Sequence, residues 1–352
     1  MAKRVVVLQP GHVVDASPYA VHLRKELDRV CEFRGPPIED HRAVLSGDVL
    51  HLNWLGDLAR FRGFARTVAY LLAYKLRRRR IAWTVHNYRP HDPHPNLRER
   101  LLYGVGRKLV LQMADVVVTF CEDTRRRLLG ELRHSRKRFG KKVIVIPHGP
   151  LDLPGRDLSK DAAKKSLGVG DRERVFLFFG QVRPYKNVDG LLEAFKEVAG
   201  PNDALVVAGK CPDRAYREKV ERLANGDDRI ALHLRFVPDD DVATYFRAAD
   251  ALVLPFREVT MTASFLLGAT FGVPVVAPRV GCVPALTRQW VGNRNVLYDP
   301  REPGALSAAM RRFVEGSNER DQGGRGRGGG GGGKFGPRWR EVARAHLHLV
   351  YG

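Results

Sequence analysis

The sequence predicts an α/β protein made of two doubly wound domains. Strand-length apolar runs alternate with helical patterns through both halves, and the connections between them are short. Residues 5–8 and 175–179 are continuously apolar, which is typical of parallel strands buried on both faces. The length of 352 residues allows about two ordinary domains. We therefore expect one domain over residues 1–150 and a second over residues 151–322.

In the first half, strands are expected at residues 5–8, 49–54, 81–86, 115–119 and 143–146. A helix is expected over residues 58–77. Its predicted core face consists of the apolar residues at helical spacing: Leu58, Phe61, Phe64, Ala65, Val68, Leu71, Leu72 and Leu76.

In the second half, strands are expected at residues 175–179, 204–208, 230–234, 251–255 and 295–298. Residues 323–333 are mostly glycine and cannot pack a core, so residues 323–336 should form a flexible linker. Residues 337–352 should hold a final amphipathic helix.

The chain is strongly basic, with a formal charge of +21 from 60 Lys and Arg against 39 Asp and Glu. This balance implies an anionic partner, but charge alone does not choose among nucleotide phosphates, anionic lipids and nucleic acid. Basic residues cluster within 60–80 and 125–142. The first residues read as a strand and not as a signal peptide, and uncharged runs are too short to span a bilayer. We therefore expect a cytoplasmic protein.

Residues 175–195 read as a strand, a glycine turn at Gly180, a basic loop and a helix. Such a junction lies at the carboxyl edge of a parallel sheet, where open α/β folds bind ligands. Arg183 and Lys186 lie in the loop, and two cations there favour an anionic ligand such as a phosphate group.

A second junction of the same kind spans residues 255–278. Thr262, Ala263 and Ser264 are small and stand at the start of its helix, so backbone N–H groups could approach a phosphate closely. No metal site is expected. The His and Asp residues that follow His86 share one Pro-rich loop and lack a distant further ligand.

The run FFGQVRPYKNVDGLLEAF resembles the donor-phosphate loop of retaining GT-B glycosyltransferases (glycosyl transferases group 1, family 4-like). The resemblance implies that Lys186 touches the donor diphosphate. The arginine usual after the glycine is Gln181 here, so its role would pass to Arg183. Glu258 matches an acid that engages the donor sugar. Leu267 stands where a second acid usually holds the ribose, which leaves ribose recognition open.

The first half resembles the same family more loosely. The resemblance implies two domains facing across a cleft, with His86 beside the donor sugar and the Gly11 loop near the acceptor. The segment IPHGP resembles the end of the first domain, and its His148 would face the cleft or serve as a structural turn residue. The last helix would cross back onto the first domain.

The expected function is transfer of a hexosyl group from a nucleoside-diphosphate sugar to an acceptor, with retention of configuration and without a metal. The expected acceptor is a lipid-linked or envelope glycan, and no cofactor is expected beyond the donor. An anionic membrane surface, the inner face of the plasma membrane, is a further expected partner. A basic nucleic-acid-binding protein is the alternative function from another class. It would explain the charge but leaves the RPYK loop and Glu258 unexplained, so nucleic acid is not an expected partner. A sugar-nucleotide epimerase or hydrolase on the same scaffold is the alternative enzyme.

Overall fold

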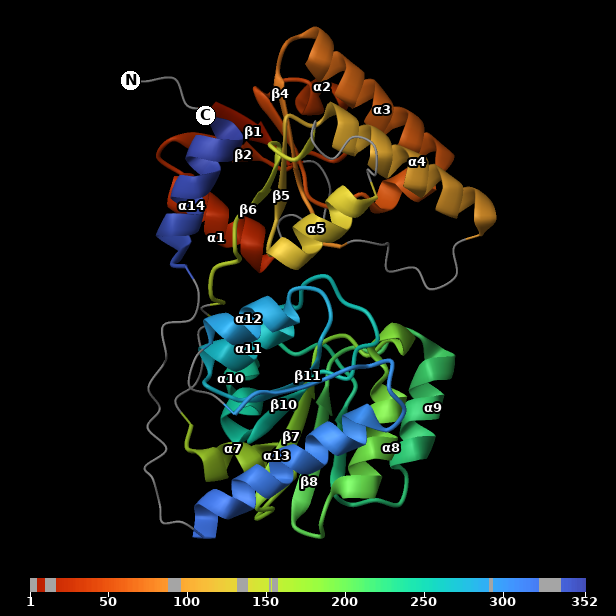
Figure 1. The fold of residues 1–352 in the computed structure, drawn as a ribbon, viewed down its shortest axis with the longest axis vertical. Coiled ribbons are helices and arrows are strands. Elements are labelled where there is room, and N and C mark those ends of the chain that lie inside the picture. Colours follow the sequence, from red (N-terminus) through yellow and green to blue (C-terminus); the bar gives the residue numbers. More distant parts are fainter. Residues whose placement is uncertain are drawn as a thin grey trace. The chain divides into compact units, whose positions relative to one another are not determined.

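The computed structural model describes residues 5–9, 17–87, 96–131, 139–151, 153, 158–290, 294–322 and 337–352. The chain divides into two compact units. Unit 1 comprises Met1–Gly149 together with Gly336–Gly352, and unit 2 comprises Pro150–Phe335 (Figure 1). Gly11 and residues 323–333, for which the sequence predicts an acceptor loop and a flexible linker, lie outside the described residues.

Unit 1 is built on a six-stranded parallel sheet in the order β2-β1-β3-β4-β5-β6. The strands are β1 (Val5–Leu8), β2 (Cys31–Arg34), β3 (Val49–Leu52), β4 (Arg80–Thr84), β5 (Val116–Thr119) and β6 (Val143–Val145). The helices are α1 (Pro18–Leu27), α2 (His41–Val44), the 3₁₀ turn η1 (Gly56–Ala59), α3 (Phe61–Leu76), α4 (Leu97–Met113), α5 (Glu122–Gly130), α14 (Trp339–His346) and the π-helical turn η3 (Leu347–Tyr351).

Unit 2 contains a second six-stranded parallel sheet, in the order β12-β11-β10-β7-β8-β9. Its strands are β7 (Arg174–Phe179), β8 (Asp203–Ala208), β9 (Ile230–His233), β10 (Ala251–Val253), β11 (Val275–Pro278) and β12 (Val296–Tyr298). Its helices are α7 (Lys160–Ser166), η2 (Pro184–Lys186), α8 (Val188–Val198), α9 (Arg214–Ala224), α10 (Asp239–Ala248), α11 (Ala263–Thr270), α12 (Val283–Gln289) and α13 (Ala305–Gln322).

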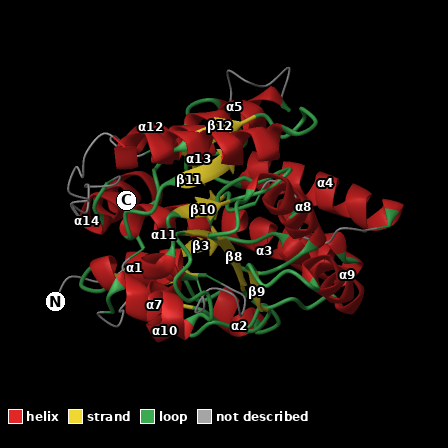
Figure 2. Cartoon of the chain, turned by 90° about the horizontal axis from the view of Figure 1, so that it is seen from below, coloured by secondary structure: helices red, strands yellow, loops and turns green. Residues whose placement is uncertain are grey.

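The prediction of two doubly wound α/β domains is confirmed. In both sheets every strand pair is parallel, and the strands lie in the interior with helices around them (Figure 2). Several strands inside the sheets are buried along their whole length: every residue of β3, β5, β8, β10 and β11 is buried. This explains their continuous apolar sequence, because side chains on both faces of a covered sheet meet helices.

The predicted core face of residues 58–77 is only partly right: Leu58 and Leu71 are buried as expected, but the rest of the buried face of α3 consists of other residues. The buried residues of this helix are Gly63, Thr67, Tyr70, Leu71 and Tyr74, while the expected core residues Phe61, Leu72 and Leu76 are exposed. The tyrosines enter the core because their hydroxyls find partners there. Tyr70 donates to the carbonyl of Ile38 (2.6 Å) and Tyr74 to that of Val44 (2.7 Å). A buried tyrosine hydroxyl with a partner avoids the cost of an unpaired polar group.

The carboxyl-terminal segment packs on unit 1. Trp339 of α14 lies against Gly149, where an added Cβ would come within 2.7 Å of the indole ring. Tyr351 is buried and its hydroxyl donates to Nδ1 of His51 (2.7 Å). Arg80 donates to the main-chain carbonyls of Leu349 (3.1 Å) and Gly352. The end of the chain is therefore part of the core of unit 1.

Candidate functional site

Each sheet has one point where the strand order reverses, and open α/β sheets bind ligands there. In unit 2 this point lies between β7 and β10, since β8 and β9 follow on one side and β11 and β12 on the other. The loop after β7 carries Arg183 and Lys186. The loop after β10 carries Glu258 and leads into α11. The two junctions that the sequence singles out are therefore neighbours at the edge of the sheet.

Three predicted features converge at the carboxyl end of β7. A Cβ added to Gly180 would lie 3.1 Å from Nζ of Lys186 and 3.2 Å from Oγ of Ser264. Gly180 has φ 126°, and its carbonyl would lie only 2.1 Å from a Cβ on Gly209. Glycine at position 209 thus allows the ends of β7 and β8 to approach closely, and glycine at position 180 leaves room for Lys186 and Ser264. Ser264 is tied to this place, because its hydroxyl donates to the carbonyl of Phe179 (2.7 Å).

Lys186 is a cation held in apolar surroundings. Its Nζ lies 5.4 Å from the ring centroid of Phe256 and 5.9 Å from that of Phe178. Within the described residues no carboxylate pairs with it. Burial, with a smaller contribution from the charge of Arg183, lowers the pKa of Lys186 to about 8. Such an amine would gain from an anion that replaces its lost hydration.

The two helices that begin at this edge differ in how their first N–H groups are satisfied. At α8 the amides of Val188 and Asp189 both donate to the hydroxyl of Tyr216 (2.9 and 3.2 Å). At α11 the side chain of Thr262 makes no capping hydrogen bond, and the first turn contains no acid. The α11 start, with Thr262, Ala263 and Ser264, is thus the helix end suited to an anion.

The remaining predicted residues of unit 2 have distinct surroundings. Arg183 is half-buried, and its Nε donates to Oε1 of Gln181 (2.9 Å). Glu258 is exposed in the loop after β10. The backbone of Gly281 packs closely against this loop at the carbonyl of Val259. Leu267 is buried within α11, so this position offers no polar group to a ribose.

A pocket of about 360 Å³ lies beside the loops, lined by Asn187, Arg257, Tyr298 and residues at the starts of α8 and α13. None of the predicted site residues lines it, although Asn187 and Arg257 are the sequence neighbours of Lys186 and Glu258.

In unit 1, His86 follows β4 and is held by two neighbours from the end of β3. Its ring stacks on Trp54 (centroids 4.5 Å apart, 17° between planes), and its Nε2 lies 3.2 Å from Oδ1 of Asn53. Burial and the neighbouring His148 and His346 lower the pKa of His86 to about 3, so the imidazole is neutral at physiological pH.

Asn53 is a residue that the sequence analysis missed. This residue is 4% exposed, and its Nδ2 has no hydrogen-bond partner among the residues that the structure describes. A buried amide with an unused donor is costly, which makes Asn53 a candidate for contacting a substrate. The available signal was a polar residue at the carboxyl end of an apolar strand, in the run VLHLNW.

His148 is buried among aromatic rings, with centroids 5.1 Å from Tyr19 and 5.4 Å from both Phe120 and Trp339. Its Nδ1–H donates to the carbonyl of Gly149 (2.7 Å), and burial lowers its pKa to about 4. This environment matches the structural alternative for His148. Across the described ranges, no three His, Cys, Asp or Glu side chains are grouped to hold a metal ion.

Comparison with known proteins identifies the family. A model of the family described as glycosyl transferases group 1 matches residues 173–316. A D-inositol 3-phosphate glycosyltransferase of Geodermatophilus obscurus is 30% identical over 335 residues, covering 87% of this chain and 69% of that protein. A GDP-mannose:glycolipid 4-beta-D-mannosyltransferase of Xanthomonas campestris is 26% identical, covering 79% of this chain and 74% of that protein.

Solved structures show the same fold. Anabaena HepE in complex with UDP and glucose matches with a TM-score of 0.61 at 15% identity, covering 99% of this chain and 96% of that one. Sucrose-phosphate synthase from Thermosynechococcus elongatus matches with a TM-score of 0.63 at 15% identity, covering 99% and 95%. The fold is thus GT-B, and the chain belongs to the glycosyl transferases group 1 family.

Proposed function

We propose that this glycosyltransferase moves a hexosyl group from a nucleoside-diphosphate sugar, bound by unit 2, to a lipid-linked or envelope glycan. The observation that carries the proposal is Lys186, a half-buried cation without a carboxylate partner in the described residues, beside Ser264 and the open start of α11. A diphosphate supplies the negative charge that this arrangement lacks.

In this proposal Lys186, Ser264 and the first amides of α11 bind the donor diphosphate, together with Thr262 and Ala263. As the glycosyl bond breaks, negative charge grows on the leaving diphosphate. Donors fixed in place before the reaction then stabilise the transition state. Arg183 contributes from the rim of the loop, where Gln181 orients its guanidinium.

In unit 2, Glu258 would recognise the donor sugar. In unit 1, His86 is the residue proposed to take part in catalysis. Because His86 is neutral, it would offer a hydrogen bond and not a positive charge. Its neighbour Asn53 would direct its free Nδ2–H to a substrate oxygen. Gly11 and His148 complete the residues expected on the acceptor side, where His148 would act by packing.

Retention of configuration, a reaction without a metal and a cytoplasmic location on the membrane's inner face are further parts of this proposal. A relative named for a glycolipid acceptor supports the lipid-linked acceptor. The deciding experiment has two stages. First, calorimetry with UDP, GDP, ADP and their sugars should find one base that binds, and Lys186→Ala should weaken it. Binding of none of them would reject the proposal.

The second stage follows the labelled sugar of the donor that binds, in the presence of a membrane lipid extract. Label in the lipid fraction supports transfer. Free sugar alone would favour the hydrolase, and a changed nucleotide-sugar would favour the epimerase.

A further inference from the structure

The paired helices α3 and α4 carry large apolar side chains on their outer surface. Phe61 is 61% exposed, Leu97 71%, Leu101 61% and Val105 51%. We call these four residues the α3–α4 face. Leu97, Leu101 and Val105 are spaced four residues apart, so they form one stripe on α4 and line a shallow hollow with Arg98 and Leu102. Figure 1 shows the two helices side by side.

The core of unit 1 does not explain this stripe. The inner side of α4 is already buried through Tyr103, Gly106, Val110 and Leu111, and Gly106 lies against Leu58 and Phe64. The outer side of a helix packed in this way is normally polar. Exposed apolar residues gathered on one such surface mark an interaction site.

Cations surround the apolar stripe. Arg62, Arg98, Arg100 and Lys108 are exposed, and none of them forms an ion pair in the parts of the chain that the structure describes. The guanidinium carbon of Arg98 lies 6.0 Å from the ring centroid of Phe61, so charge and apolar surface are intermixed. Nearby acids do not cancel this charge: Oδ2 of Asp57 lies 3.8 Å from Nη2 of Arg66, with which it pairs, and Glu99 is half-buried. The surface is thus apolar with a positive rim.

Not all basic residues of the two clusters within 60–80 and 125–142 are available to bind lipid phosphates. Several cations of the two basic runs bind carbonyls within unit 1: Arg79 those of Leu45 and Gly47, Arg125 those of Val143 and Gly140, and Lys142 those of Gln112 and Ala114. These side chains stabilise the fold. The free cations lie instead at the start of α3 and along α4.

We infer that the α3–α4 face docks on an anionic lipid bilayer, with its apolar side chains in the interface and its cations on lipid phosphates. A basic rim around exposed Leu and Phe matches such a surface in both charge and polarity. No helix in the described residues combines the length and apolar composition needed to cross a bilayer. The inference deepens the proposed function, because it names the surface that would meet a lipid-linked acceptor, but it concerns lipid binding and not transfer.

The test is co-sedimentation of the full chain with vesicles of phosphatidylcholine alone or with 30 mol% phosphatidylglycerol. We expect binding only to the anionic vesicles and release at high salt. The variant Leu97→Ser/Leu101→Ser should bind at least tenfold more weakly. The variant Arg62→Gln/Arg98→Gln/Arg100→Gln should lose roughly fivefold for each charge.

Matched controls come from exposed residues elsewhere in unit 1. Val21→Ser/Val30→Ser and Lys25→Gln/Arg29→Gln/Arg42→Gln change similar side chains outside the face and should bind like the parent. Equal losses in controls and test variants would overturn the inference, as would equal binding to neutral vesicles. Light scattering tests whether a second copy of the chain covers the face instead. If the parent forms a dimer and does not bind vesicles, and the Leu97→Ser/Leu101→Ser variant is monomeric, the face would be assigned to a second copy.

Nucleoside-diphosphate binding is measured on every variant and should stay unchanged. Lipid binding without nucleotide binding would reject the proposed function alone, and the reverse would reject the membrane surface alone.

Discussion

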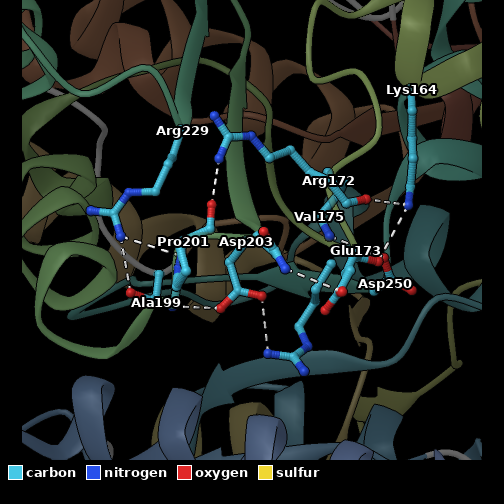
Figure 3. Close-up of polar contacts among 12 residues, drawn as sticks. Lys164, Arg172, Glu173, Val175, Ala199, Pro201, Asp203, Arg229 and Asp250 are labelled. Carbon is cyan, nitrogen blue, oxygen red and sulfur yellow. Dashed lines mark hydrogen bonds and ion pairs between the residues drawn. The ribbon is translucent and has the colours of Figure 1, made fainter.

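In the sheet of unit 2, charged side chains are paired at the amino ends of the strands, whereas a cation without a carboxylate partner in the described residues lies at their carboxyl ends. At the amino edge, shown in Figure 3, charged side chains are paired. Asp203 accepts from the amide of Gly200 (2.8 Å) and from Arg174 (3.1 Å). Asp250 accepts from the amide of Val175 (3.0 Å). At the carboxyl edge, Lys186 has no carboxylate partner within the described residues.

The difference separates structural charges from binding charges. At the amino edge, carboxylates accept hydrogen bonds from backbone N–H groups near the first residues of the strands, and these bonds stabilise the positions where the strands begin. At the carboxyl edge, the cost of a half-buried cation is left uncompensated in the free protein. A structural charge should therefore show its effect in stability, and a binding charge in affinity.

The largest effect is expected from breaking the amino edge. Asp203→Ala removes a mostly buried carboxylate that accepts from both Arg174 and the Gly200 amide, and should lower the free energy of unfolding by about 3–5 kcal/mol. Urea denaturation measures this change. The control is Asp228→Ala: its 86% exposed carboxylate pairs with Arg172 and should matter by less than about 1 kcal/mol. Equal effects in both variants would contradict the distinction.

At the carboxyl edge, Glu258 tests whether an acid that is proposed to bind substrate affects turnover and not stability. Glu258→Gln should reduce turnover by roughly 10²-fold, on the scale of losing one preorganised electrostatic contact, while the unfolding free energy stays within about 0.5 kcal/mol. Steady-state transfer assays and calorimetry with the bare nucleoside diphosphate check this. A variant that turns over at the parent's rate removes Glu258 from the site.

Lys186→Ala should weaken binding of the nucleoside diphosphate by about 1.5–3 kcal/mol, the usual value of a charge-assisted hydrogen bond. Lys196→Ala on the exposed side of α8 is the matched control and should bind normally. Stability should change in the other direction. Because folding lowers the pKa of Lys186, its charged form opposes folding at pH 7, so Lys186→Met should keep or raise the free energy of unfolding.

The pH dependence of binding should be shifted for the same reason. With a pKa of about 8 in the free protein, Lys186 loses its proton as the pH rises through 8, whereas an ordinary lysine stays charged to about pH 10. The contribution of Lys186 to affinity should fall roughly fourfold by pH 8.5. Calorimetry on the parent and on Lys186→Ala from pH 6.5 to 9.5 isolates this part. A constant ratio of the two affinities would refute it.

The smallest effect is expected for Arg183→Ala, below about 1 kcal/mol in nucleotide affinity, because its guanidinium is already bonded to Gln181 at the rim. Gln181→Ala is the companion variant, since it frees Arg183 and should alter affinity by a similar small amount. A loss as large as that of Lys186→Ala would mean that Arg183 lies deeper in the site than its surroundings indicate.

Much of the fold follows from sequence pattern, because buried parallel strands and amphipathic helices leave strong periodic signals. The limits of β1 were predicted to the residue, and those of β8 to within one residue. Strand β2 was missed, since CEFR carries two charges and lies at the edge of the sheet, where one side of the strand is unpaired. The face of α3 was misread because the partners of Tyr70 and Tyr74 come from distant residues.

The site divides in the same way. Lys186 and Ser264 could be named because strand, glycine and helix follow one another along the chain. Asn53 could not, because its significance is an unpaired donor in a buried place, and burial depends on helices from elsewhere in the chain. The burial of His148 similarly depends on Trp339, almost two hundred residues later.

Unit 1 is discontinuous in sequence, because Trp339, His346 and Tyr351 pack in it although unit 2 precedes them along the chain. On the ribosome, all of Pro150–Phe335 is therefore made before unit 1 receives its last helix. During this time His51 and Tyr19 lack the partners that Tyr351 and His346 later supply. Unit 2 can thus complete its fold before residues 336–352 are added to the core of unit 1.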